Sequence, residues 1–235
     1  MGKIHLIGTI HNDFKGRKRL EKALEEEKPD IITLEASQSS LDYCLNTYDD
    51  DLKMSLKALK DMGISDSAYS FFEGYLNLMA SERIFEYQVC KNYSEKNGIP
   101  LYLVGDDDNN NLINLKKDML SQITSLDPKL LDEISYENIT EGHDYLYSTV
   151  QGLYDGKIPT SVGEEHLINP LRGAIIGKTD ETGAKNIEEL LSKYDTAKIV
   201  HVGGGAHMLS DSSKETLYSR LENFNPSRRT LMSYD

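Results

Sequence analysis

The chain has 235 residues, 38% of them hydrophobic, and a formal net charge of -13. The negative charge argues against a nucleic-acid partner, because such proteins present a positive face to the phosphates. No apolar run approaches the roughly 20 residues of a membrane span. The first residues lack a basic segment followed by an apolar stretch, so we expect no signal peptide. We therefore expect a cytoplasmic protein without a membrane span. The partner that we expect is a peptide or small-molecule substrate, and a homo-oligomer is left open.

Apolar runs and helical stripes alternate along the chain. The runs predict buried strands within Ile4–His11 and at Ile31–Leu34, Leu101–Val104 and Lys198–Val202, with a last edge strand at Thr230–Tyr234. The stripes predict helices at Lys15–Lys28, across Ser40–Asn97, and at Leu112–Ile123, Pro128–Gly156, Asn186–Tyr194 and Lys214–Asn223. The segment Lys157–Lys185 is rich in Gly, Pro and Thr and predicts a long loop.

This alternation predicts the α/β fold class, with a mainly parallel central sheet flanked by helices. We expect a single domain over residues 1–235. Helical insertions at about 40–98 and 109–185 would cover the carboxyl edge of the sheet, where ligands bind in open α/β folds.

Polar motifs follow the predicted strands. The pattern G-x-x-H occurs as Gly8–His11 and again as Gly204–His207. Glu35 directly follows the second strand, and Asp106, with Asp107 and Asp108, follows the third. Because the carboxyl ends of parallel strands meet at one edge, these side chains are predicted to share a site.

Two histidines and a carboxylate suit a divalent ion such as Mn, Co, Zn or Fe. We expect His11, His207 and Glu35 as ligands, with Asp106 as a further one. The ion would lower the pKa of a bound water, and Glu35 is either a ligand or the general base. Alternatively, the two histidines are structural, or they act as acid and base without metal.

Several other residues are candidates for the same site. Gly8, Thr9, Gly204 and Gly205 would let the backbone approach a substrate closely. Arg172 is either a clamp for a substrate carboxylate or oxyanion or a simple surface arginine. His5 and His201 lie inside strands and are interpreted as hydrogen-bonded core histidines.

The motifs I-G-T-I-H, P-D-I-I-T-L-E and V-G-G-G-A-H, in this order, resemble the TraB/PrgY (pheromone shutdown), GumN and Tiki group. That group is related more distantly to the erythromycin esterase and ChaN-like proteins. The resemblance implies a peptidase-like, manganese- or cobalt-dependent site at His11, Glu35 and His207. Where the family carries an arginine, in R-x-x-x-x-A-x-x-I, this chain has Thr179–Ile187 without one, and Arg172 is the candidate replacement.

Three functions follow as hypotheses. The first is a metal-dependent hydrolase of a peptide, amide or ester bond. The second is a metal-independent, esterase-like hydrolase in which a histidine activates water directly. The third is a non-catalytic regulator that binds a peptide or a haem-like ligand.

Overall fold

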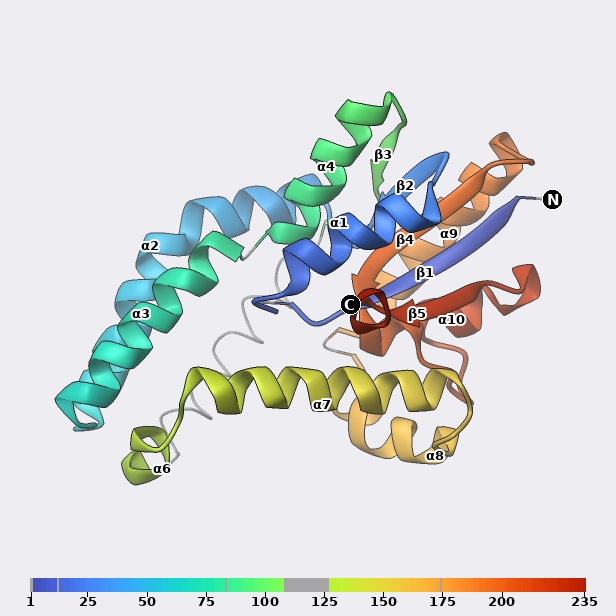
Figure 1. Cartoon of the computed structure of the whole chain (residues 1–235). Coiled ribbons are helices and arrows are strands. Elements are labelled where there is room, and N and C mark those ends of the chain that lie inside the picture. The colour runs from blue at the N-terminus through green and yellow to red at the C-terminus, as the bar shows by residue number, and fades with distance from the viewer. Residues whose placement is uncertain (1, 12, 83, 108–126, 174) are drawn as a thin grey trace.

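The computed structural model describes residues 2–11, 13–82, 84–107, 127–173 and 175–235. Its centre is a parallel sheet with the strand order β3-β2-β4-β1-β5 (Figure 1). The strands are β1 (Lys3–Thr9), β2 (Ile31–Leu34), β3 (Leu101–Leu103), β4 (Lys198–Gly204) and β5 (Ser227–Thr230). The predicted α/β class with a mainly parallel sheet is confirmed.

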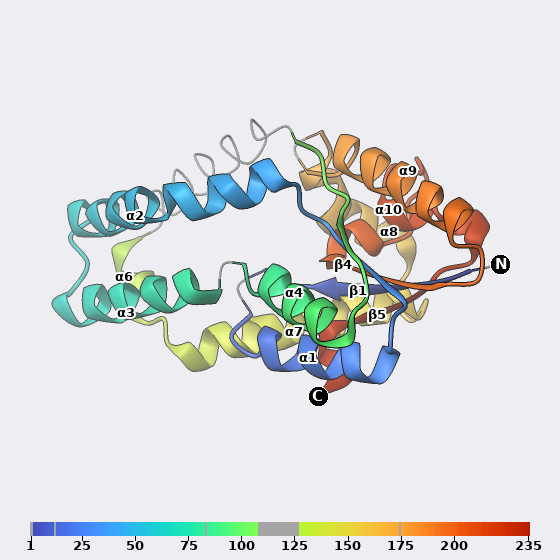
Figure 2. The ribbon, with the colours of Figure 1, turned by 90° about the horizontal axis from the view of Figure 1, so that it is seen from above.

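Helices cover both faces of the sheet. On one face, α1 (Gly16–Glu27) and α4 (Phe85–Asn97) bury apolar side chains such as Leu20 and Phe85 against the strands. On the other, α9 (Lys178–Lys193) and α10 (Leu217–Arg220) bury Ile187 and Leu217. Figure 2 shows the two layers on opposite sides of the strands. The sheet is held between two apolar layers, as parallel sheets require.

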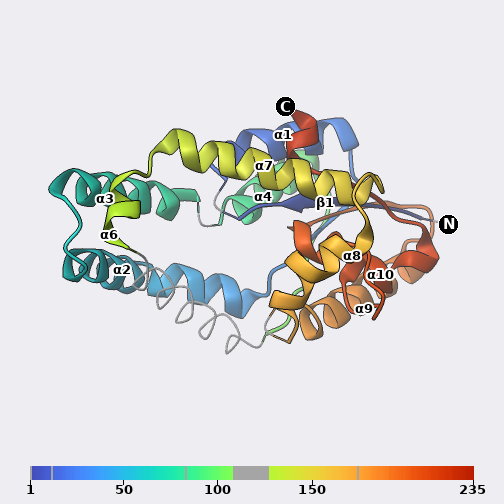
Figure 3. The same ribbon diagram turned by 90° about the horizontal axis from the view of Figure 1, so that it is seen from below.

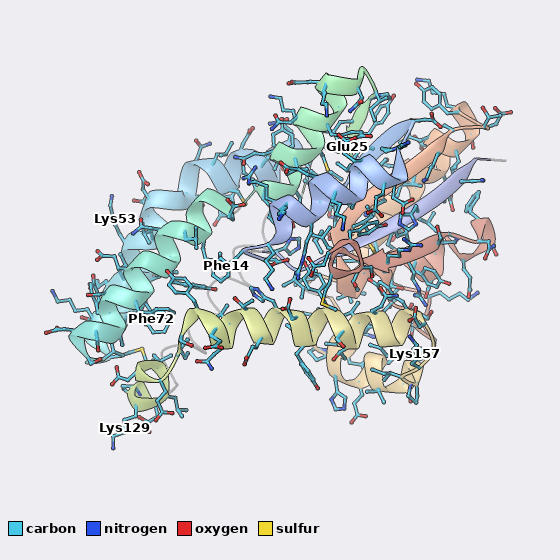
Figure 4. All side chains as sticks on the ribbon, in the orientation of Figure 1. Phe14, Glu25, Lys53, Phe72, Lys129 and Lys157 are labelled. Atoms are coloured by element: carbon cyan, nitrogen blue, oxygen red, sulfur yellow. The ribbon has the colours of Figure 1, made fainter. Side chains whose placement is uncertain are left out.

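A helical arm extends beyond the carboxyl edge of the sheet. It contains α2 (Gln38–Asp61), α3 (Asp66–Glu82) and the short α6 (Pro128–Asp132) (Figure 1). The long α7 (Tyr136–Tyr154) runs from this arm back along the sheet (Figure 3). Phe14, labelled in Figure 4, lies between α3 and α7. Its ring centroid is 5.6 Å from that of Tyr75 in α3 and 5.7 Å from that of Tyr136 in α7.

The segment predicted as a long loop, 157–185, is largely helical, so that prediction was wrong. It contains α8 (Thr160–Gly163), a π turn (Glu164–Ile168), a 3₁₀ turn (Asn169–Leu171) and the start of α9. Helix α9 begins at Lys178, eight residues before the predicted helix at Asn186–Tyr194. The first turns of α9 have no stripe of large apolar residues, because a small residue packs against Leu217: a Cβ on Gly183 would lie 3.4 Å from Leu217 Cδ1.

Other boundaries also differ from the prediction. Residues 128–156 form two helices, α6 and α7, and not one. Ser135 caps the start of α7, because its side chain accepts a hydrogen bond from Asn138 N. The closing helix shortens to α10 and a 3₁₀ turn (Glu222–Phe224). After β5 the chain forms another 3₁₀ turn, where the buried Leu231 and Tyr234 are spaced by three residues, as a 3₁₀ helix favours. The predicted helix at Leu112–Ile123 lies outside the described residues.

Within the described parts of the chain, no helix combines the length and apolar character needed to cross a bilayer.

Candidate functional site

The two G-x-x-H motifs lie on neighbouring strands. The parallel register of β1 and β4 pairs Gly8 with Gly203 and Thr9 with Gly204. Strand β2 lies on the other side of β4, where Glu35 N donates to Val202 O at 2.9 Å. The ends of β1, β4 and β2 therefore present His11, His207 and Glu35 along one short stretch of the carboxyl edge.

These three side chains converge beside Gly204. A Cβ on Gly204 would lie 3.2 Å from His207 Cδ2, 3.3 Å from His11 Nε2 and 3.7 Å from Glu35 Oε2. Glycine at this position leaves a space between the two histidines that any other residue would fill.

His207 is held between two carboxylates. It lies in a 3₁₀ turn (Gly205–Met208) directly after β4, and its side chain is only 4% exposed. Its Nδ1 lies 2.8 Å from Asp180 Oδ1, and its Nε2 lies 2.9 Å from Glu35 Oε1. Burial opposes the charged form, but Glu35 and Asp180 outweigh it and raise the pKa of His207 well above its ordinary value.

Glu35 is held on both oxygens. Its Oε1 pairs with His207, and its Oε2 accepts a 2.7 Å hydrogen bond from Gly204 N. Burial raises the pKa of this carboxyl, but the charge and hydrogen bond of His207, together with the charge of His11, lower it to about 2. Glu35 is therefore an anion at neutral pH.

His11 is the accessible member of the group. Its side chain is 62% exposed, and its Nδ1 lies 2.9 Å from Oε1 of the largely buried Glu86. The surrounding protein disfavours the charged imidazole, but the Glu86 charge and hydrogen bond and the Glu35 charge raise the pKa of His11. Solvent weakens this attraction at an exposed side chain. Thr9 Oγ1 donates to the same Glu86 oxygen at 3.1 Å, which places Thr9 in support of this pair.

Two of the candidate glycines take part in packing. A Cβ on Gly8 would lie 2.5 Å from the Tyr154 hydroxyl oxygen. The same hydroxyl donates to Gly205 O at 2.8 Å. Gly8 and Gly205 thus admit Tyr154 beside the turn that carries His207, whereas Gly204 faces the histidines.

Two other predicted residues have partners elsewhere. Asp106 Oδ2 lies 2.9 Å from Lys178 Nζ at the start of α9. Asp107 accepts from Ser39, and Asp108 lies outside the described residues.

Arg172 also has its own partners. All three of its guanidinium nitrogens are engaged: Nε donates to Asn169, Nη1 pairs with Glu215, and Nη2 lies 3.4 Å from Asp211 Oδ2. The structure places Arg172 in this acidic group, where its charge is balanced.

Sequence reasoning missed the carboxylates that hold the histidines. Glu86 lies in the first turn of α4, and Asp180 in the first turn of α9, where acidic residues favour the positive end of the helix dipole. Asp180 is itself fixed by backbone N–H donors, from Leu217 to Oδ1 and from Gly177 to Oδ2. The only sequence signal was an acidic residue at a helix start, which does not indicate a histidine partner.

The donor types of this group suit a transition metal. When a metal lies about 2.1 Å from each of two adjacent ligands, the ligand atoms are about 3.0 Å apart at an octahedral angle and about 3.4 Å apart at a tetrahedral one. His207 Nε2 and Glu35 Oε1 are 2.9 Å apart. A carboxylate on the second nitrogen of each imidazole is typical of metal-ligating histidines. However, in the described part of the chain no three His, Cys, Asp or Glu side chains are grouped closely enough to hold an ion. The donor types of His207 and Glu35 suit an ion, but the two side chains form a direct ion pair, and His11 would have to close on them before three donors met at one point.

Together, the fold and the site define an α/β protein with two carboxylate-bound histidines and a glutamate at the carboxyl edge of a parallel sheet. Comparisons with protein-family models, with curated proteins and with solved structures found no match.

Proposed function

We propose that the chain is a metal-dependent hydrolase that cleaves an amide or ester bond in a peptide or small molecule. The observation that carries this proposal is the shared arrangement of the two histidines. Each has its Nδ1 on a carboxylate, and the ring nitrogen Nε2 of each lies near Glu35 or the free space beside Gly204. The resemblance of the motifs to the TraB and Tiki group supports a peptidase-like substrate.

In this proposal, Nε2 of His11, Nε2 of His207 and the Glu35 carboxylate hold the ion. A divalent ion there supplies a water of lowered pKa and polarises the carbonyl of the substrate. Mn, Co and Zn are the candidates, because imidazole and carboxylate donors suit them.

The remaining groups orient these donors. Glu86 and Asp180 keep the Nδ1 hydrogens of the two imidazoles, so Nε2 is the atom that each imidazole would offer to the ion. Nε2 of His207 would first have to lose the hydrogen that it donates to Glu35. Gly204 N–H fixes one oxygen of Glu35, so the other serves as a ligand or accepts the proton of the attacking water. The exposed face of His11 is where a substrate carbonyl enters.

A second candidate is a metal-free hydrolase. It is favoured by the direct contact of His207 Nε2 with Glu35, which leaves His11 as the accessible imidazole. His11, oriented by Glu86, would then remove a proton from water. Because the pKa of His11 is raised, turnover by this route would increase with pH as the imidazole loses its proton.

Calorimetric titration with Mn²⁺, Co²⁺ and Zn²⁺ tests the proposal. We expect one ion per chain in the wild type and none in the His11→Ala/His207→Ala variant. His166→Ala is the matched control, because that side chain is 67% exposed and its ion-pair partner is Glu165, which is not a residue of the site. Metal binding by this variant should equal that of the wild type.

Turnover is then measured on peptide libraries and chromogenic esters, with and without a chelator. Loss of turnover with the chelator and its return with added ion support the metal-dependent route. Turnover that the chelator leaves unchanged supports the metal-free route. Binding of a peptide or of haem without turnover would refute both and favour the non-catalytic regulator.

A further inference from the structure

Another histidine with polar partners lies on strand β1, away from the carboxyl edge of the sheet. His5 is 5% exposed, and it lies four residues, about 13 Å of strand, before Thr9. Its Nδ1 lies 2.8 Å from Ser227 Oγ, at the start of the edge strand β5, and its Nε2 lies 2.7 Å from the hydroxyl of Tyr234. Ser227 is exposed, whereas Tyr234 is buried. The imidazole therefore connects an accessible hydroxyl to a buried one.

The hydroxyl of Tyr234 determines the tautomer of His5. This hydroxyl donates to Glu27 Oε1 at 2.7 Å, so towards His5 its oxygen can only accept. The hydrogen of the neutral imidazole therefore lies on Nε2, and Nδ1 presents a lone pair to Ser227 Oγ. Another acceptor for the Ser227 hydroxyl, Ile4 O, is 3.4 Å away, so the imidazole is the closer one. Ser227 thus donates its hydrogen to His5.

The charges around His5 suit a base. Burial lowers the pKa of His5 and outweighs the raising effect of the Glu27 charge, so the imidazole is neutral at pH 7 and can accept a proton. Burial raises the pKa of Glu27, but hydrogen bonds from Lys198 and Tyr234 lower it, so Glu27 is an anion. Its Oε1 lies 3.4 Å from His5 Nε2, where its charge stabilises an imidazolium. A hydroxyl, a base and a group that orients the base are the parts of an activated nucleophile.

We propose that Ser227 is a nucleophile that is acylated by acyl phosphates, at a site separate from the two G-x-x-H histidines. Ser227 Oγ attacks the acyl carbon and forms an ester bond, while its hydrogen passes to His5 Nδ1. The bond between the acyl carbon and the phosphate oxygen breaks, and phosphate leaves as an anion with both electrons of that bond. His5 then releases the proton to solvent.

Two observations favour this class of acyl donor. His5 is nearly enclosed, so a leaving group that is stable without a proton from the imidazole is required, and phosphate is one. Arg229 is two residues after Ser227, so its side chain lies on the same side of β5. That side chain is 54% exposed, and its Nη1 is 3.9 Å from Glu27 Oε1, at the outer limit of an ion pair. The guanidinium can therefore bind an anionic leaving group such as phosphate.

Incubation with acetyl phosphate, followed by peptide mass spectrometry, tests the proposal. Hydroxylamine distinguishes the expected serine ester from acetylated lysine, because it cleaves the ester and leaves the amide intact. Ser227 should be acetylated at least about 100-fold faster than Ser192, a factor typical of a positioned base. Ser192 is the internal control, since it is also exposed but its hydroxyl donates to Glu188 O. Equal rates at the two serines would overturn the proposal, and this comparison requires no variant.

The role of His5 is tested next. Ser227→Ala should lose the hydroxylamine-sensitive acetyl group. His5→Gln keeps a hydrogen-bonding side chain but no base, so it should slow acetylation of Ser227 by at least about 100-fold. NMR of the wild type should find His5 neutral with its hydrogen on Nε2. Acetylation of His5→Gln at the wild-type rate, or a hydrogen on Nδ1, would overturn the proposal.

The acyl donor and the independence of this site are tested together. Arg229→Gln should slow acetylation by acetyl phosphate by about 10-fold, with little effect on acetylation by 4-nitrophenyl acetate, whose leaving group is not a phosphate. Equal effects on both donors would refute the assignment of acyl phosphates. A chelator should leave acetylation of Ser227 unchanged, so this site can fail or succeed separately from the proposed metal-dependent function.

Discussion

Replacing Gly204 by alanine tests whether the space between the two histidines is the functional point. The residue has φ -59° and ψ 134°, which alanine adopts without strain. The added methyl group would lie 3.2 Å from His207 Cδ2 and 3.3 Å from His11 Nε2, contacts that are tight but can relax by small shifts of the exposed His11. We expect the free energy of unfolding to change by no more than about 1 kcal/mol, since the alanine also restricts the unfolded chain.

The effect on function should be much larger. An ion held by both imidazoles and Glu35 would occupy the region that the methyl group fills. We expect metal affinity and turnover to fall by at least about 10-fold. Calorimetric titration gives the affinity, and urea denaturation followed by circular dichroism gives the stability.

Gly203→Ala is the matched comparison on the neighbouring residue. There the methyl group would overlap Glu35 Oε2 and lie 2.9 Å from His201 Nε2, both buried atoms with little freedom to move. This variant should lose about 1–3 kcal/mol of stability through overpacking. A Gly204→Ala protein that binds metal and turns over substrate as the wild type does would refute the placement of the site.

Three further predictions concern charge. Glu86→Gln keeps the hydrogen-bond acceptor for His11 but removes its negative charge, so the pKa of His11 should fall, as NMR titration would show, and metal affinity should drop by about 10-fold. The raised pKa of His207 keeps this imidazole protonated until an ion displaces the proton, so metal affinity should decrease from about pH 8 to about pH 6. Calorimetry in buffers of different ionisation enthalpy should detect the release of this proton. Binding that does not depend on pH would contradict this prediction. Arg19→Met leaves the buried Asp13 without its cation and should cost about 3–5 kcal/mol in urea denaturation, whereas Arg17→Met should cost no more than about 1 kcal/mol; equal losses would contradict the reasoning.

The part of the site that follows strands could be predicted from the sequence. A run such as Ile31–Leu34 is buried on both faces and ends abruptly at Glu35, so its polarity pattern locates the carboxyl edge directly. The two G-x-x-H motifs could be predicted as parts of the site in the same way, because each follows an apolar run that forms a buried strand. A parallel sheet converts these sequence positions into spatial neighbours through backbone pairing alone.

The groups contributed by helices could not be predicted in this way. Glu86 is 75 residues from His11, and Asp180 is 27 residues from His207. Their pairing depends on where α4 and α9 pack against the sheet, which is decided by tertiary contacts such as that of Gly183 with Leu217. A polar residue in the first turn of a helix has the same local signature whether it faces solvent or a histidine.

The strand order explains why β4 carries more of the site than the other strands. It lies between β1 and β2, so His11 approaches from one side and Glu35 from the other, while β4 supplies His207 from its end and His201 from beneath. A side chain on β4 at Gly203 or Gly204 would displace a group contributed by a neighbouring strand. The consecutive glycines are therefore a consequence of this central position: three strands can meet at one point only if the middle strand has no side chains there.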